Sequence, residues 1–193
     1  MSKQASQKRG VLFIMSAPAG TGKTTLASML VKGYPSIVRS ISYTTRDPRG
    51  LEKNAKDYFF VSEEEFSSMK QKGEFLETAQ IYGHHYGTSK AQVEELLGQG
   101  KHVLLVIDTQ GSKRLKNQVE AVRVFVSPPS MEELENRLEK RKTESKEDLQ
   151  KRLDFAQREL QTKDEYDYHI INDDLQRAYE VLKAIIVAEE HRI

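Results

Sequence analysis

Residues 16–25, SAPAGTGKTT, place two glycines, a lysine and a threonine at a spacing that suits phosphate binding. In the pattern G-x-x-x-x-G-K-[ST], a glycine-rich turn directs backbone N–H groups at phosphate oxygens, and the lysine reaches the β- and γ-phosphates. Gly22, Lys23 and Thr24 fill the last three fixed positions, and Ala17 replaces the first glycine. We expect a nucleotide site here, with the Thr24 hydroxyl as a ligand of Mg²⁺. The alternative is a glycine-rich turn with an incidental lysine.

A second group of polar side chains, between residues 42 and 92, suits a mononucleotide. Arg46 and Arg49 are three residues apart, and guanidinium pairs donate bidentate hydrogen bonds to a phosphate dianion. Glu77 lies in a mostly apolar run, where its carboxylate could accept from guanine N1–H and N2–H₂ together, a donor pair that adenine lacks. The neutral donors of this group are two phenols and two hydroxyls suited to guanine O6, namely Tyr58, Tyr86, Ser42 and Thr88. Each residue alone also suits an ordinary surface or core position, but together they favour a mononucleotide site.

The elements that must position these residues follow a strand–helix alternation. Continuous apolar runs predict strands buried on both faces of a parallel sheet, at Val11–Met15, His102–Asp108, Val122–Val126 and Tyr168–Ile171. After the glycine-rich loop, apolar residues recur at helical spacing from Thr24 until Gly33 and Pro35. The loop therefore lies between a strand and a helix, and the alternation predicts a parallel α/β sheet. Asp108 ends a strand at the edge where such sheets bind ligands; capping a helix is its alternative role.

Two segments break this alternation. Residues 43–92 are rich in Tyr, Thr, Gly and His and contain short alternating runs, which predict a small antiparallel insertion. The stretch 139–152, EKRKTESKEDLQKR, is a highly charged break between two helices, which we interpret as a mobile flap. Capping residues are expected at Ser62, at Ser130 and at Asp173 or Asp174.

The composition indicates one soluble, globular unit. The chain has 193 residues, with 31% charged and 37% hydrophobic, and a net charge of +1, so bulk attraction to nucleic acid or membrane is not expected. There are no cysteines, which excludes disulfides and thiolate metal sites and fits a cytoplasmic location. The first apolar run is too short for a signal segment or a membrane span, and residues 1–9 are predicted to be a flexible tail.

A phosphate loop alone leaves three classes open: a GTPase switch, an ATPase motor and a small-molecule kinase. The guanine motif N-K-x-D of GTPases is absent from the sequence, and residues 108–111 only loosely match D-x-x-G. The cluster between residues 42 and 92 instead favours a kinase with a nucleotide acceptor.

The chain resembles the guanylate kinase family from about Gly10 to its C-terminus. The motifs that carry the resemblance are T-G-K-T, S-Y-T-T-R-D-P-R, K-D-Y-F-F, F-L-E-T-A-Q, Y-G-T-S, I-D-T-Q-G and P-P-S. The resemblance implies a P-loop NTPase-like parallel sheet flanked by helices, an antiparallel insertion that binds the nucleoside monophosphate, and a helical lid. It also implies transfer of the γ-phosphoryl group of ATP to GMP, with Mg²⁺, giving ADP and GDP.

The resemblance also implies boundaries within a single domain, residues 1–193. The core would comprise about 10–41, 93–128 and 165–193, the GMP-binding insertion about 42–92, and the lid about 129–164.

Site residues follow from the resemblance position by position. The GMP-binding positions fall on Ser42, Arg46, Arg49, Glu52, Tyr58, Glu77, Tyr86, Thr88 and Asp108. The ATP-binding positions fall on Ala17, Pro18, Ala19, Gly20, Thr21, Gly22, Lys23, Thr24, Thr25 and Asn172. The catalytic cations would be Lys23, Arg46 and the lid arginines Arg137, Arg141 and Arg152. Without the resemblance, the lid arginines would suit a solvated helix with ion pairs, such as Glu133 with Arg137.

The chain departs from the family pattern at two positions. Ala17 is common in the family, and alanine suits this position if its φ is negative. Val106 stands where the family usually has the first acid of D-x-D, so Asp108 is the only carboxylate at this strand end. Two alternatives stay open: a non-catalytic, guanylate-kinase-like module that binds proteins, and a related kinase with another phosphorylated acceptor. No obligate protein partner is expected, and tolerance of dGMP is left open.

Overall fold

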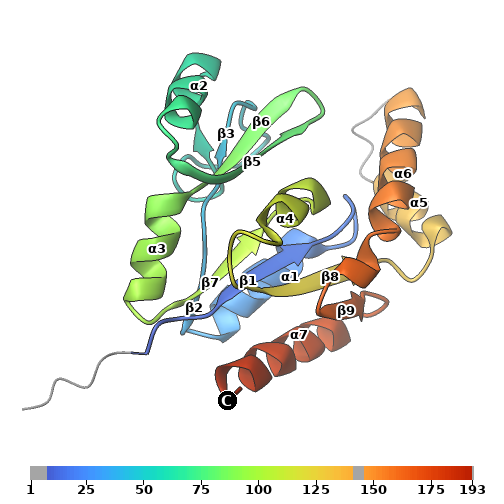
Figure 1. The fold of residues 1–193 in the computed structure, drawn as a ribbon. Coiled ribbons are helices and arrows are strands. Elements are labelled where there is room, and N and C mark those ends of the chain that lie inside the picture. Colours follow the sequence, from blue (N-terminus) through green and yellow to red (C-terminus); the bar gives the residue numbers. More distant parts are fainter. Residues whose placement is uncertain (1–7, 141–145, 193) are drawn as a thin grey trace, which may run out of the picture.

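A computed structural model of the chain describes residues 8–140 and 146–192 (Figure 1). Its centre is a five-stranded sheet in the order β2-β7-β1-β8-β9, in which neighbouring strands run parallel. The strands are β1 (Leu12–Ser16), β2 (Ile37–Arg39), β7 (His102–Val106), β8 (Val122–Ser127) and β9 (Tyr168–Ile171). The carboxyl ends of all five strands therefore lie along one edge, as predicted for a parallel α/β fold.

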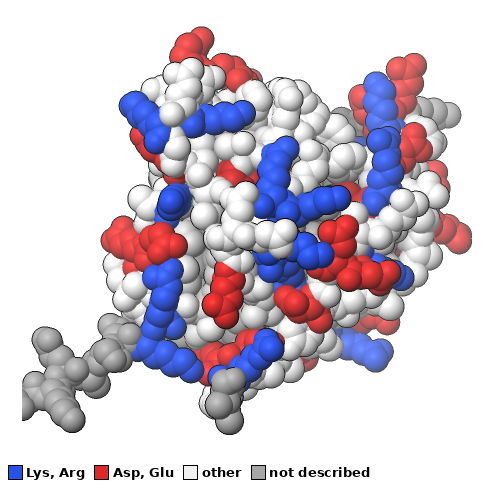
Figure 2. Space-filling model, viewed as in Figure 1, with Lys and Arg blue, Asp and Glu red and all other residues white. Residues whose placement is uncertain are grey.

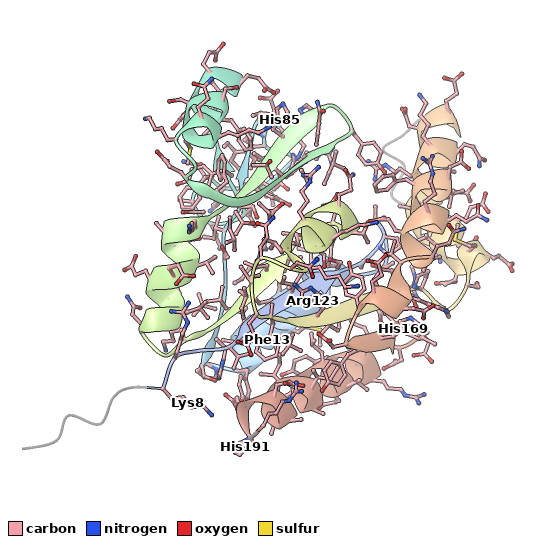
Figure 3. The ribbon with its side chains drawn as sticks, in the orientation of Figure 1. Lys8, Phe13, His85, Arg123, His169 and His191 are labelled. Atoms are coloured by element: carbon pink, nitrogen blue, oxygen red, sulfur yellow. The ribbon has the colours of Figure 1, made fainter. Side chains whose placement is uncertain are left out.

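Helices cover both faces of this sheet. The helices α1 (Lys23–Gly33) and α7 (Leu175–Glu190) pack on one face, and α3 (Lys90–Gly98) and α4 (Thr109–Leu115) pack on the other. Because side chains alternate along a strand, Phe13 faces α1 and α7 while Ile14 faces α3 and α4, and both are fully buried. Figure 3 shows Phe13 inside this layered core.

Residues 43–89 contain a second, four-stranded sheet in the order β4-β3-β6-β5. Its elements are β3 (Tyr43–Thr44), β4 (Phe59–Phe60), β5 (Phe75–Ile81), β6 (His84–Ser89) and the helix α2 (Glu63–Gln71). Two of its three pairings are antiparallel, but β3 and β4 run parallel. The expected antiparallel insertion is thus mixed, because the long connection between β3 and β4 brings the chain back in the same direction.

Two further helices, α5 (Met131–Glu139) and α6 (Lys146–Leu160), pack through Leu134, Leu138, Leu153 and Ala156. A short 3-10 helix, Lys163–Glu165, follows them. The charged stretch 139–152 was expected to be a break, yet its residues 146–152 form the start of α6. Glu147, Asp148 and Lys151 lie on the exposed face of this amphipathic helix, so a run of charges does not interrupt the helix. Arg141 lies outside the described residues.

The predicted caps are confirmed. Ser62 and Ser130 accept from the backbone N–H three residues on, and of the two candidate aspartates it is Asp174 that caps α7. The strand β2 was not predicted, because three residues after a proline give too short a pattern. Within the described ranges, no helix combines the length and apolar character needed to cross a bilayer.

Candidate active site

A cavity of about 160 Å³ opens at the carboxyl ends of β2 and β7, beside the start of α1, and reaches into the second sheet. It is lined by Lys23, Thr24, Arg39, Ser42, Tyr58, Glu77, Ala79, Ile81, Tyr86, Val106, Ile107 and Asp108. The glycine-rich loop and part of the predicted acceptor group, far apart in the sequence, thus share one cavity.

The loop between β1 and α1 adopts a backbone that requires glycine at two positions. Gly20 and Gly22 have φ values of 91° and 90°, in the left-handed region that side chains disfavour. Ala17 is buried and has no positive φ, so alanine is tolerated at the first position of the pattern. A Cβ at Gly20 would also lie 2.9 Å from Leu138 Cδ2, so α5 packs directly on this loop.

Lys23 is held across the loop by two backbone carbonyls. Its Nζ donates to the oxygens of Ala17 at 3.2 Å and Ile107 at 3.3 Å. Burial lowers the pKa of Lys23, while the nearby carboxyl groups of Glu159 and Asp108 act in the opposite direction. The ammonium is therefore fixed between β1 and β7, where a phosphate bound to the loop would meet it.

Asn172, directly after β9, holds the same loop. Its Nδ2 donates to the Thr21 carbonyl at 2.6 Å, and the Asn172 side chain is buried. This donor is occupied by the loop, so the asparagine predicted for the adenine side supports the loop backbone directly. Thr24 and Thr25 are exposed at the start of α1, and Thr24 also lines the cavity.

Glu77 and Asp108 present two buried carboxylate oxygens without partners among the described residues, Oε2 and Oδ2. The other oxygen of each is occupied: Glu77 Oε1 accepts from Thr88 Oγ1 at 2.7 Å, and Asp108 Oδ1 accepts from Gly111 N at 2.9 Å. Thr88, expected to donate to guanine O6, thus donates to Glu77 here. Burial raises the pKa of Glu77 to about 7, with Thr88 opposing, and also raises the pKa of Asp108. Buried acceptors without donors cost free energy that a ligand with N–H groups would recover.

Arg46 is buried at the centre of a hydrogen-bond network that includes Tyr86, a residue that lines the cavity. Its Nη2 donates to both carboxylate oxygens of Glu52, at 3.1 and 2.9 Å, and its Nε donates to Tyr86 Oη at 3.2 Å. Its guanidinium also lies over the Tyr58 ring. Glu52 therefore holds Arg46 in this structure, whereas the predicted Arg49 is exposed and contributes its backbone N–H to Glu52.

The two described arginines that were predicted for the lid, Arg137 and Arg152, contact different parts of the structure. Arg137 donates to Glu133 at 2.9 Å and to the Asn172 carbonyl at 3.1 Å, so the ion pair considered as its alternative role is present. Arg152 lies 5.2 Å from the ring centroid of Tyr82, which also contacts Phe155. Tyr82 is at the tip of the β5–β6 hairpin, which points towards α6 in Figure 1. The structure therefore joins α6 to the second sheet through aromatic contacts.

Cations also gather around α4. Figure 2 shows Lys and Arg side chains clustered in the middle of the viewed face, in front of that helix. The last turn of α4 carries Lys113 and Arg114, and the charge of Arg114 acts to lower the pKa values of Glu77 and Asp108. No group of three or more His, Cys, Asp or Glu side chains within the described ranges could hold a metal ion.

Sequence reasoning missed Glu159 and Arg39. Glu159, on α6, is 5% exposed, and its Oε1 accepts from Thr109 Oγ1 at 3.2 Å. The sequence feature that could have revealed Glu159 is a carboxylate next to the apolar stripe of α6. Arg39 is the last residue of β2, and a cation at the carboxyl end of a strand could have indicated a ligand-binding role. This feature was missed because β2 itself was not predicted.

Glu159 gives a prediction about stability. Burial raises its pKa to about 7 from 4.5, with Lys23 opposing, so the folded state favours the protonated form. The contribution of Glu159 to the free energy of unfolding is therefore lost as pH rises from 4.5 to about 7, and it does not return at higher pH. Because glutamine is neutral and can still accept from Thr109, Glu159→Gln should raise the melting temperature at pH 8 and leave it nearly unchanged at pH 4. Calorimetry at both pH values measures this, and a lower melting temperature at pH 8 would show instead that Lys23 makes the ionised carboxylate stabilising.

The parallel sheet, with its glycine-rich loop running from β1 into α1, defines a P-loop NTPase-like fold. A sequence model described as guanylate kinase matches residues 9–189. The chain is 54% identical to a guanylate kinase of Protochlamydia amoebophila (strain UWE25), over 96% of this chain and 94% of the relative. The chain belongs to the guanylate kinase family.

More distant relatives agree over the same length. A guanylate kinase of Caldanaerobacter subterraneus subsp. tengcongensis is 46% identical over 97% of this chain and 91% of the relative. The crystal structure of guanylate kinase from Anaplasma phagocytophilum superimposes with a TM-score of 0.81 at 34% identity, covering 96% of this chain and 89% of that one. The similarity therefore includes the five-stranded sheet, the second sheet and the helices α5 and α6 together.

Proposed function

We propose that this protein transfers the γ-phosphoryl group of ATP to GMP, giving ADP and GDP. The observation that carries the proposal is the pair of buried acceptors on Glu77 and Asp108, in residues that line the same cavity as Lys23 of the phosphate loop. Guanine brings N1–H and N2–H₂ donors to such acceptors, whereas the Watson–Crick edge of adenine brings only its N6 amine. We propose that Ser42 donates to O6, since Thr88 is engaged with Glu77.

The chemistry needs positioning more than proton transfer. The second pKa of a phosphate monoester is about 6, so an oxygen of the GMP phosphate is already ionised at neutral pH and attacks the γ-phosphorus directly. The new O–P bond forms as the bond to the β-phosphate oxygen breaks, and ADP leaves. In our proposal Lys23 binds the donor phosphates, and Arg46, Tyr58 and Tyr86 bind the acceptor phosphate. Closure of the lid would exclude water and limit ATP hydrolysis.

Magnesium fits the residues that are present. Mg²⁺ bound with a nucleotide takes few protein ligands and keeps waters and phosphate oxygens around it. The Thr24 hydroxyl, exposed and lining the cavity, is the candidate ligand, and valine at position 106 is compatible with so small a protein contribution. When bound, the ion neutralises charge on the phosphates.

A coupled assay of ADP release tests the proposal directly. Purified protein with ATP and Mg²⁺ should release ADP rapidly with GMP and at background rate with AMP, UMP or dTMP. Comparable rates with all four would contradict guanine recognition. No release with any of them would favour the alternative of a non-catalytic, protein-binding module, which the intact phosphate loop and Lys23 argue against.

GMP affinity should depend on pH through Glu77. Its pKa of about 7 means that GMP must displace a proton from Glu77 at lower pH, because a protonated Glu77 would set an O–H donor against the N–H donors of guanine. The dissociation constant should rise about tenfold for each pH unit below 7. Calorimetry between pH 5.5 and 8 measures it. Because the GMP phosphate also titrates near pH 6, Glu77→Gln is the control and should show a shallower dependence; equal slopes would contradict the assignment.

A further inference from the structure

Arg39 lines the active-site cavity together with residues of both proposed substrate sides. It ends β2 and lines the cavity with Lys23 and Thr24 of the donor side and with Ser42 and Tyr58 of the acceptor side. We infer that Arg39 is a further phosphate-binding residue, whose guanidinium contacts the phosphoryl group during its transfer from donor to acceptor. This inference rests on the proposed function.

The guanidinium of Arg39 has unused donors. Its Nη2 donates to the Asp57 carbonyl at 3.2 Å, and its Nε is buried with no partner among the described residues. A guanidinium has five N–H donors, and leaving them unpaired away from water costs free energy. A ligand with phosphate oxygens would supply the missing acceptors in the bidentate geometry that this side chain favours.

No carboxylate within the described part of the chain forms an ion pair with Arg39. In the register of β2 and β7, Arg39 is opposite Leu104, so Val106 follows two residues on and faces the same side of the sheet. Val106 lines the cavity and offers only hydrocarbon. The carboxylate of Asp57 accepts from the Lys53 N–H at 2.8 Å, while its carbonyl faces Arg39. The positive charge of Arg39 is therefore available to bind an anionic ligand.

Arg39 also adds to the positive potential around the phosphate loop. Its charge contributes to lowering the pKa of Lys23, after burial and against Glu159 and Asp108, so the two cations act on each other. Like charges in a partly buried cavity are unfavourable unless an anion lies between them. The same charge also lowers the pKa of Tyr58, although burial raises it overall. The charge of Arg39 therefore affects the pKa of a group on each substrate side, as expected for a cation that contacts the phosphoryl group during its transfer.

Kinetics of Arg39 variants test the inference. Arg39→Met keeps the length of the side chain without its charge and should lower kcat with ATP and GMP about 10- to 100-fold, with each KM changed less than about threefold. Arg39→Lys should recover part of kcat, since it restores the charge without the planar fork. Arg177→Met, in an exposed arginine on α7, is the matched control and should behave as the wild type. If Arg39 served only to hold the Asp57 carbonyl, Arg39→Met would raise KM for GMP and lower the melting temperature while kcat stayed unchanged, which would overturn the inference.

Binding of a dinucleotide in which five phosphates join adenosine to guanosine separates this inference from the proposed function. Calorimetry should show tight binding to the wild type and about tenfold or weaker binding to Arg39→Met. No binding to the wild type, together with no GMP-dependent ADP release, would reject the proposed function. Equal binding to the wild type and to Arg39→Met, with an active wild type, would reject only the role of Arg39.

Discussion

Replacing Lys23 by alanine is expected to lower kcat about a thousandfold, the range seen when a single charge-stabilising group is removed from a reaction centre. Two carbonyls already hold the Lys23 ammonium in place, so its orientation is prepared before the nucleotide binds. The reaction brings two polyanions together, and alanine would remove the cation fixed at the end of the phosphate loop. The coupled ADP assay with GMP measures the loss.

The matched control for this change is Lys32→Ala. Lys32 is exposed in the last turn of the same helix, α1, so it tests the general effect of removing a lysine. Its variant should keep wild-type kcat and KM. Turnover of Lys23→Ala within tenfold of the wild type would contradict the role given to the phosphate loop.

Glu77→Gln should raise KM for GMP about 10- to 150-fold, since hydrogen bonds to a charged group contribute about 1.5–3 kcal/mol. The amide of glutamine would oppose N–H donors of guanine with donors of its own, while its carbonyl can still accept from Thr88. KM for ATP should change less than about twofold, because Glu77 belongs to the acceptor side. Steady-state kinetics with each substrate varied in turn measures both constants.

Glu74→Gln provides the control, since Glu74 is exposed just before β5 and lines no part of the cavity. It should leave both constants unchanged. An equal loss of affinity for GMP and ATP in Glu77→Gln would remove Glu77 from guanine recognition and indicate a general structural role.

The sequence predicted the parts of this protein that depend on local pattern. The strand, loop and helix around Lys23 were predicted because a continuous apolar run, two glycines and a helical period follow one another directly. The caps at Ser62 and Ser130 were predicted for the same reason, as each depends on a contact only three residues away.

The parts that escaped prediction depend on contacts between distant segments. The partner of Glu159 comes from α4 and the partner of Arg39 comes from the turn before β4, so no local sequence pattern indicates these contacts. The engagement of Thr88 with Glu77 also needs the register of β5 and β6, which a β-bulge between Phe75 and Glu77 shifts. The roles of the site residues in binding stay predictions.

The contact of Tyr82 with Arg152 and Phe155 connects the second sheet to α6. A shift of the β5–β6 hairpin on GMP binding would therefore alter the same packing that a shift of α6 on ATP binding alters. Thermodynamic linkage makes such an interaction reciprocal: the factor by which bound ATP changes the affinity for GMP equals the factor by which bound GMP changes the affinity for ATP. If GMP shifts the hairpin and ATP shifts α6, the contact at Tyr82 would couple the two affinities through a single coupling free energy.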